Sequence, residues 1–251
     1  MTRVITVANQ KGGVGKTTTA VNVAFFLGLA GRKTLLIDLD PQANATSSLG
    51  VSFPGLSPFH VKLAGGFTET AIIESGEPNL WVVPARPGHD FSPSLTATTA
   101  DFIQHVRELL APYDFVIIDS PPSVGAITKF SLQLADSVLI PIQCEYLAME
   151  GLSQMLPLIA RLSAARETPL QIERLVFTMF DENSQHCASV VEEVTSHFPS
   201  DASENIVPRD MSLAEAASHS LPVFRYDPRS RASWAYLTLT KEILNGRQEA
   251  R

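Results

Sequence analysis

The chain has 251 residues, 45% of them hydrophobic and 18% charged, and carries a formal net charge of −7. This length and apolar content suit one large α/β domain, which we predict over residues 1–251. The negative charge disfavours strongly basic nucleic-acid-binding proteins, and no apolar run is long enough for a transmembrane helix. Two cysteines without a CxxC pair, and an N-terminus without a secretory signal, predict a cytoplasmic protein with no membrane partner.

A glycine-rich turn lies between a strand-like run, Val4–Ala8, and a helix-like run over residues 19–27. Strand, glycine turn and helix form the context of a phosphate-binding P-loop. The glycines let successive backbone N–H groups face a polyphosphate, and the helix directs its positive end at the same anion. A flexible turn without a ligand is the alternative, which the Lys-Thr-Thr after the last glycine disfavours. The residues predicted to bind nucleotide are Gly12, Gly13, Val14, Gly15, Lys16, Thr17 and Thr18.

Within this loop, Lys16 is positioned to reach the β- and γ-phosphates and the Thr17 hydroxyl to hold Mg²⁺. Lys11 stands where the first glycine of the usual motif would be, so the loop is a modified Walker A sequence. On its own, Lys11 would be an ordinary solvated loop charge.

Two aspartates follow apolar runs that read as buried parallel strands. The first run, Thr34–Asp38, follows Gly31, which is suited to closing the first helix. Asp40 comes just after this run. Asp40 precedes a proline, where aspartate often only forms a turn, but its place at a strand end favours a functional carboxylate. Asp119 ends the run Phe115–Asp119 and, paired with the P-loop, indicates a Walker B aspartate that holds Mg²⁺.

The remaining pattern alternates strands with helices, which predicts a doubly wound, mostly parallel sheet flanked by helices, a Rossmann-like P-loop fold. Residues 51–88 are weakly patterned and rich in Gly, Pro and Ser. The predicted helices are Phe67–Ile73, Thr98–Leu110, Glu145–Arg166, Ala188–Phe198, Leu213–Ala217 and Ser233–Leu244. The further predicted strands are Leu80–Ala85, Ser137–Ile142, Leu175–Phe180 and Ile206–Asp210, with a basic loop over Arg225–Arg231.

The chain resembles the ParA/MinD family of deviant Walker A ATPases, and the ParA/Soj type in particular, over nearly its full length. The matching stretches are Lys11–Thr18, Asp38–Gln42, Ile117–Ser123, Pro141–Glu145 and Tyr226–Arg231. The resemblance implies an ATPase that uses ATP and Mg²⁺ and forms a homodimer around the nucleotide, with Lys11 crossing to the phosphates of the other subunit. It also implies that Asp40 positions the attacking water, that Thr17, Asp40 and Asp119 serve the metal, and that Pro208 and Arg209 line an adenine pocket.

For the ParA/Soj type, the resemblance further implies an ATP-driven cycle of dimerisation and nonspecific binding to double-stranded DNA in the nucleoid. A ParB/Spo0J-like partner then stimulates hydrolysis and release. This sequence departs from the family in two loops that are usually basic, here 181–185 and 210–212, which contain acidic residues. The remaining candidates for DNA contact are Arg209, Arg225, Arg229, Arg231, Lys241 and Arg247.

Other functions on the same fold are compared by the residues they need. A MinD-like membrane-cycling ATPase needs an amphipathic C-terminal helix, but residues 245–251 have no apolar face. A nitrogenase-type reductase needs a cysteine after the Walker B strand, where Ser120 stands. A small-molecule ligase or kinase would need a second pocket, which residues 51–88 could supply. A ParA relative that positions another cargo is the strongest alternative, because its ATPase chemistry would be identical.

Overall fold

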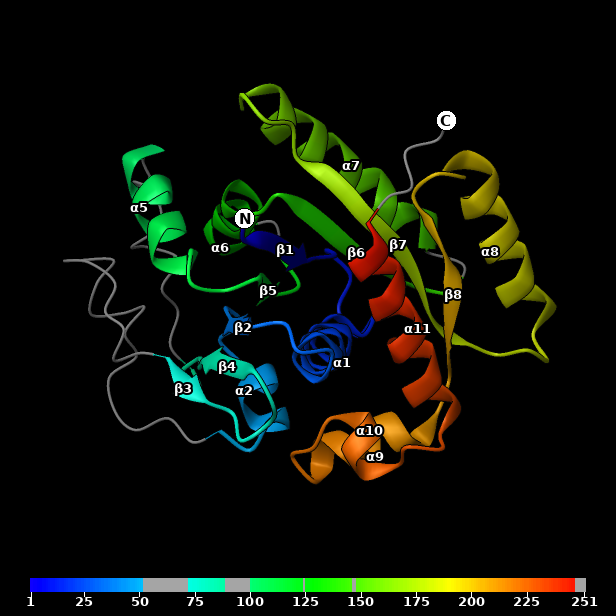
Figure 1. The fold of residues 1–251 in the computed structure, drawn as a ribbon. Coiled ribbons are helices and arrows are strands. Elements are labelled where there is room, and N and C mark those ends of the chain that lie inside the picture. Colours follow the sequence, from blue (N-terminus) through cyan, green and yellow to red (C-terminus); the bar gives the residue numbers. More distant parts are fainter. Residues whose placement is uncertain (52–71, 89–99, 124, 146–147, 247–251) are drawn as a thin grey trace.

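The computed structural model describes residues 1–51, 72–88, 100–123, 125–145 and 148–246 (Figure 1). The described strands join one eight-stranded sheet in the order β3-β4-β2-β5-β1-β6-β7-β8. Neighbouring strands are parallel except β3 and β4, which pair antiparallel. The strands are β1 (Arg3–Val7), β2 (Thr34–Asp38), β3 (Ile73–Glu74), β4 (Leu80–Val83), β5 (Phe115–Asp119), β6 (Ser137–Gln143), β7 (Gln171–Phe180) and β8 (Ala202–Pro208).

Helices cover both faces of this sheet, as the predicted doubly wound fold requires. One face packs against α5 (Ala100–Leu110), α6 (Ala126–Leu134), α7 (Ala148–Ala164) and α8 (Gln185–His197). The other face packs against α1 (Lys16–Leu29), α2 (Asn44–Ser48), α9 (Met211–Ser218), α10 (Val223–Tyr226) and α11 (Arg231–Asn245). The fold class predicted from the alternation of strands and helices is therefore confirmed.

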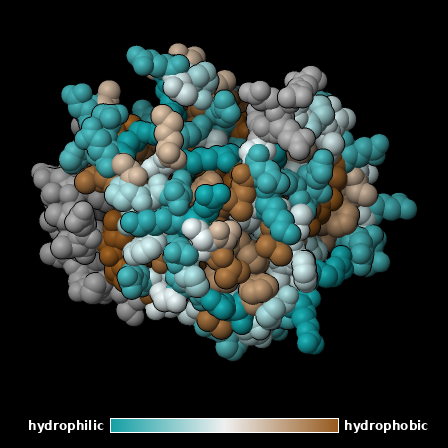
Figure 2. Space-filling model, viewed as in Figure 1, coloured by the Kyte–Doolittle hydropathy of each residue, from teal (hydrophilic) through white to brown (hydrophobic). Residues whose placement is uncertain are grey.

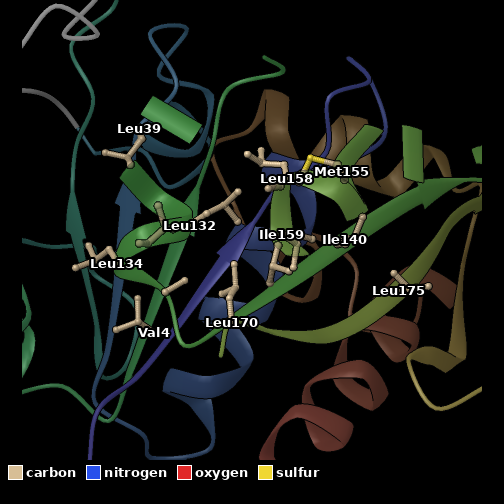
Figure 3. Close-up of a cluster of buried hydrophobic side chains, with 14 of the residues drawn as sticks. Val4, Leu39, Leu132, Leu134, Ile140, Met155, Leu158, Ile159, Leu170 and Leu175 are labelled. Carbon is tan, nitrogen blue, oxygen red and sulfur yellow. The ribbon is translucent and has the colours of Figure 1, made fainter. Parts of the chain in front are cut away.

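The core forms because successive residues of a buried strand point to opposite faces of the sheet. In β5, Ile117 packs on the α1 side and Ile118 on the α6 side, and both are fully buried. Figure 3 shows the α6–α7 side of this core, where Leu132 of α6 and Met155 of α7 lie among strand residues such as Ile140. Each such side chain contributes roughly 1.5–3 kcal/mol by leaving water, so the central strands are held rigidly on both faces.

Element boundaries differ from the predictions mainly where polar residues are buried or a side chain caps a helix. Strand β7 begins at Gln171 rather than Leu175 and includes the buried Glu173, whose carboxylate binds Arg3. Helix α11 begins at Arg231 rather than Ser233, because the Ser230 hydroxyl accepts a hydrogen bond from the backbone N–H of Ser233.

Several short elements were not predicted at all. The sequence pattern did not indicate α2 or α6, and α10 occupies the first residues of the segment expected to be a basic loop. The helix expected over Phe67–Ile73 lies outside the described residues up to position 71, and Ile73 begins strand β3 instead. These elements are short, so their periodicity is too brief to distinguish them from loops.

Hydrophilic residues cover much of the face shown in Figure 2, and hydrophobic ones appear between them in separate areas. Among the helices in the described part of the chain, none combines the length and the apolar character needed to cross a bilayer.

Candidate nucleotide-binding site

The site is built at the carboxyl edge of the sheet, where strands β1, β2 and β5 end side by side. Val7 pairs with Asp119 and Asp119 with Asp38, so the loops that follow these strands start in one row. In the loop after β1, Gly13 and Gly15 have positive φ angles of 76° and 84°, which residues with a Cβ rarely adopt. Gly15 is the N-cap of α1 and gives no side-chain cap, so the first N–H groups of the helix are open to an anion.

Lys16, the first residue of α1, places its ammonium inside this loop. The residue is only 7% exposed, and Nζ donates a hydrogen bond to the carbonyl oxygen of Lys11 at 2.9 Å. Burial lowers the pKa of Lys16, while the charges of Asp119 and Asp40 act in the opposite direction. The predicted phosphate-binding lysine therefore lies with two carboxylates at the positive end of a helix.

Asp119 and Thr17 form the second part of the site. The Thr17 hydroxyl donates to Asp119 Oδ2 at 2.7 Å, whereas Asp119 Oδ1 is buried and has no hydrogen-bond partner in the described structure. Burial, and next the charge of Asp38, raise the pKa of Asp119 well above its ordinary value. A buried carboxylate oxygen without a partner is costly, and a bound divalent cation is one way to satisfy it.

Asp38 and Asp40 complete a row of carboxylates. Asp38 accepts hydrogen bonds from the hydroxyl and the backbone N–H of Thr46, at 2.7 and 2.8 Å, and from the N–H of Asp40 at 3.1 Å. Burial raises the pKa of Asp38 to about 6. Asp40 is 6% exposed and accepts from the backbone N–H of Gln42 at 2.9 Å, as in an Asx turn. Asp38 was not among the predicted site residues, although its place at a strand end was the available signal.

Lys11 lies at the more exposed side of the loop. Its Nζ is 3.4 Å from Glu145 Oε2, and its side chain is 28% exposed. The other oxygen of Glu145 accepts from Gln143 Nε2 at 2.5 Å and lies 4.0 Å from an Arg209 nitrogen. The structure thus brings Lys11 and Arg209 to the same carboxylate, which follows β6 at the sheet edge.

A cavity of about 260 Å³ lies beside the loop. Its lining includes Gly15 and Thr18 of the loop and the predicted pair Pro208 and Arg209. The volume is below that of whole ligand pockets, so it suits one part of a larger ligand, such as a base. Sequence reasoning missed two other lining residues, Thr178 and Met179, which lie near the end of β7. Thr178 donates a hydrogen bond to the Val14 carbonyl at 3.0 Å, and Met179 has a φ of 54°, unusual for a residue with a side chain.

The basic residues considered for DNA contact have different surroundings. Arg225 forms an ion pair with Glu77 at 2.8 Å and lies over the ring of Phe25. Arg231 pairs with Glu182 at 3.2 Å, so the acidic loop after β7 takes up part of its charge. Arg229 and Lys241 are exposed, Arg209 lines the cavity beside Gly15, and Arg247 lies outside the described residues.

Comparison with known proteins gives consistent results. A family model described as "AAA domain" matches residues 2–172. The chain is 37% identical to the Treponema pallidum chromosome-partitioning ATPase Soj, with 97% of this chain and 98% of that protein covered. It is 39% identical to the Bacillus subtilis sporulation initiation inhibitor protein Soj, with the same coverage. Among solved structures, cobyrinic acid a,c-diamide synthase from Mycobacterium smegmatis with bound ADP and magnesium is 29% identical, with a TM-score of 0.83, and covers 100% of this chain and 97% of its own.

Proposed function

Because this chain belongs to the ParA/Soj family of chromosome-partitioning P-loop ATPases, we propose that it is an ATP-dependent dimerising switch in chromosome or plasmid partition. The family makes the chain an ATPase, and its reaction is the hydrolysis of ATP to ADP and phosphate. The observation that carries the proposal is the convergence of Lys16, Thr17 and Asp119 at the uncapped N-terminus of α1. Phosphate-binding donors and a metal-binding carboxylate then meet at one point.

The residues present fit Mg²⁺ and ATP. Asp119 offers a buried oxygen that has no hydrogen-bond partner in the described part of the chain, and Thr17 offers a hydroxyl in contact with the same carboxylate. Mg²⁺ is usually held by one or two protein ligands together with phosphate oxygens and water, so Thr17, Asp119 and the neighbouring Asp40 suffice. When bound, the ion neutralises charge on the phosphates. The M. smegmatis relative was solved with ADP and magnesium, which supports the same pair of ligands here.

The side chains divide the work of hydrolysis among them. Lys16 and the N–H groups of Gly13–Thr18 hold the phosphates, and Asp40 orients the attacking water. Pro208 and Arg209 hold the adenine in the cavity beside Gly15. Little covalent chemistry is required of the protein, because positioning and charge neutralisation provide most of the rate enhancement.

Lys11 couples nucleotide binding to dimerisation. In the single subunit its ammonium rests on Glu145 at the surface, a contact between partly exposed groups that is worth about 1 kcal/mol or less. Such a contact is easily exchanged for the triphosphate of a second subunit, where Lys11 stabilises the charge on the phosphates. The ATP-bound dimer then binds double-stranded DNA without sequence preference and is released when a ParB/Spo0J-like partner stimulates hydrolysis. This cycle places the protein in the cytoplasm and, with ATP, on the nucleoid.

The first test concerns the switch itself. With ATP and Mg²⁺ the wild type is expected to elute as a dimer in size-exclusion chromatography with light scattering, and to revert as ATP is consumed. Asp40→Ala is expected to form the dimer and keep it, with turnover lowered at least about 100-fold. Normal hydrolysis by Asp40→Ala would mean that its assigned role is wrong.

The second test concerns DNA. Retention of a random duplex is expected only with ATP, and the logarithm of affinity should fall with the logarithm of salt at about −0.9 per phosphate neutralised. Because Arg229 and Lys241 are exposed, their alanine variants should each reduce this slope by about one phosphate contact. If the ATP-bound dimer fails to retain DNA even at low salt, the cargo is not positioned through DNA, and the interpretation as an ATPase for another cargo takes its place.

A further inference from the structure

Asn9 joins the phosphate-binding loop to strand β6. The residue is 4% exposed and lies two positions after β1 ends. Its Oδ1 accepts a hydrogen bond from the backbone N–H of Lys11 at 3.1 Å, and its Nδ2 donates to the carbonyl oxygen of Pro141 at 2.7 Å. The main-chain bonds between β1 and β6 reach Ala8, whose N–H donates to Leu139 at 3.1 Å. The Asn9 side chain thus adds one more hydrogen bond between the end of β1 and β6, and also bonds the backbone N–H of Lys11.

Helix α7 closes directly on this side chain. A Cβ placed on Gly151 would lie 3.1 Å from Asn9 Oδ1 and 3.6 Å from Nδ2, so glycine leaves the space that the amide occupies. The helix cannot easily move away, because Met155, Leu158 and Ile159, in the following turns, are buried in the core (Figure 3). Asn9 is therefore enclosed between β6 and α7.

The same elements hold the other end of Lys11. Glu145, which contacts the Lys11 ammonium, lies between β6 and α7. The backbone N–H of Lys11 is bound by Asn9 and its ammonium rests on Glu145, so both contacts depend on the carboxyl end of β6. Without the Asn9 acceptor, the peptide that carries the Lys11 N–H would lose this bond, and only the Lys11 carbonyl would stay bound, to Lys16 Nζ. Because the ammonium stands at the end of a long flexible stem, small backbone rotations displace it considerably.

We propose that Asn9 is a positioning residue, which directs Lys11 toward the partner's nucleotide by bonding the Lys11 N–H and anchoring on Pro141 beneath Gly151. The inference rests on the proposed role of Lys11 in the ATP-bound dimer. Asn9 makes no contact with the nucleotide-binding donors Lys16 and Thr17 among the hydrogen bonds of the described residues. Its effect should accordingly fall on dimerisation and turnover and leave the binding of ATP to a single subunit nearly unchanged.

The first experiment substitutes the amide. Asn9→Ala is expected to lower kcat and weaken ATP-dependent dimerisation by about tenfold each, the effect of one ordinary buried hydrogen bond. The affinity of the dilute monomer for a fluorescent ATP analogue should change by less than about twofold. Asn9→Ser restores an acceptor that can bond the N–H two residues on, though more weakly, and should recover part of the loss.

A matched control is Asn22 in α1, which is also 4% exposed and also makes two hydrogen bonds. Its Nδ2 donates to Thr18 and its Oδ1 accepts from the N–H of Val223, both at 2.8 Å. Asn22→Ala removes an equally buried amide that has no bond to Lys11. It should lower Tm at least as much as Asn9→Ala does, with a clearly smaller loss of dimerisation.

The second experiment adds a methyl group on α7, next to the Asn9 amide. Alanine is the better helix former, which offsets part of the cost of displacing Asn9, so Gly151→Ala should lower Tm less than Asn9→Ala does. The added methyl displaces Asn9 Oδ1, so dimerisation and kcat should fall by more than the change in Tm accounts for. In an Asn9→Ala background the methyl meets no amide, so Gly151→Ala should then cost nothing further. This non-additivity identifies the contact between the two residues as the cause.

Four outcomes would overturn the inference. If Lys11→Ala dimerises and hydrolyses ATP normally, the proposed function fails, and the inference with it. If Lys11→Ala is defective but Asn9→Ala behaves like Asn22→Ala, the role of Lys11 stands and the positioning role of Asn9 is wrong. The positioning role is equally wrong if Gly151→Ala has full activity, or if its loss is equal with and without Asn9.

Discussion

Buried carboxylates at the two ends of the sheet differ in how completely they are satisfied. At the amino end, Glu173 is 3% exposed and receives two hydrogen bonds from Arg3, at 2.5 and 2.6 Å, and one from the Ser137 hydroxyl at 2.6 Å. At the carboxyl end, Asp119 is fully buried, has one oxygen without a hydrogen-bond partner among the described residues, and shares its surroundings with Asp38. The first arrangement is complete as it stands, whereas the second has a place for a cation. In this fold, the carboxylate with all its hydrogen bonds made serves the structure, and the carboxylate with an unpaired oxygen is available for function.

The largest effect is expected for the Lys16 ammonium at the carboxyl end of the sheet. Lys16→Ala removes the ammonium that lies with Asp119 and Asp40, so the site becomes a group of carboxylates that repels phosphate. Nucleotide binding should be lost, and hydrolysis should fall at least about 100-fold. Titration with a fluorescent ATP analogue and a phosphate-release assay measure both. Retained binding would mean that the backbone N–H groups alone hold the phosphates.

Glu173→Gln tests the carboxylate at the amino end of the sheet. The variant keeps the shape but leaves Arg3 without its carboxylate, and Ser137 loses a charged acceptor. Because Arg3 is 30% exposed, water offsets part of the loss, and we expect the free energy of unfolding to fall by about 2–3 kcal/mol. Urea unfolding gives this quantity, and ATP affinity measured on the folded variant should be unchanged. A stability equal to the wild type would remove the contrast between the two ends.

The pH dependence of stability sharpens the comparison at Asp38, whose pKa is raised to about 6. A carboxyl with a higher pKa in the folded state binds more protons folded than unfolded, so its contribution to stability falls as pH rises from about 4 to 6. In metal-free buffer with EDTA, this group should lower the free energy of unfolding by about 2 kcal/mol across that window. Asp38→Asn should reduce the slope. A wild-type slope of the opposite sign, unchanged in Asp38→Asn, would contradict the prediction.

Asp119→Asn should have a smaller effect on stability and one of opposite sign to Glu173→Gln. Replacing the charged carboxyl relieves its burial and the repulsion from Asp38, so the metal-free protein should gain about 1 kcal/mol. Magnesium-dependent hydrolysis should be lost at the same time. Thermal unfolding with EDTA and an ATPase assay with Mg²⁺ measure the two. Joint loss of stability and activity would place Asp119 with the structural carboxylates.

The smallest effect is expected for Glu145→Gln, because both members of this ion pair are partly exposed. The free energy of unfolding of the monomer should change by less than about 0.5 kcal/mol. The variant frees the Lys11 ammonium, so dimerisation with ATP should occur at an equal or lower protein concentration. Weaker dimerisation would show that Glu145 also acts within the dimer.

The sequence alone was sufficient to predict the central strands of the sheet and the loop that follows β1. Strands β1, β2 and β5 are mostly apolar, and β2 and β5 each end in a single aspartate, so these runs and the glycine turn predicted both the sheet and the P-loop. Lys16, Thr17 and Asp119 do meet in space, as expected. The start of β7 was hidden because Glu173 reads as a surface residue until Arg3, far away in the sequence, is seen to bind it.

Residues whose partners lie far away in the chain could not be predicted. Thr178 reaches the loop through Val14, and Asn9 matters because Gly151 leaves room for it, and neither relation produces a local pattern. Asp38 looked like the end of a strand, and only its burial beside Asp119 and its bonds from Thr46 give it a role. Local spacing identifies the groups that touch a ligand more readily than those that hold them in place.

The alignment of Val7, Asp119 and Asp38 across three strands limits how this chain can change length. Side chains alternate along a strand, so one inserted residue within β1, β2 or β5 would turn the terminal group to the other side of the sheet. The loops directly after these ends are restricted as well, because they carry Gly13, Gly15 and Asp40 at fixed positions. Natural variation and protein engineering should therefore find these three strands, and the loops that follow them, closed to single-residue additions.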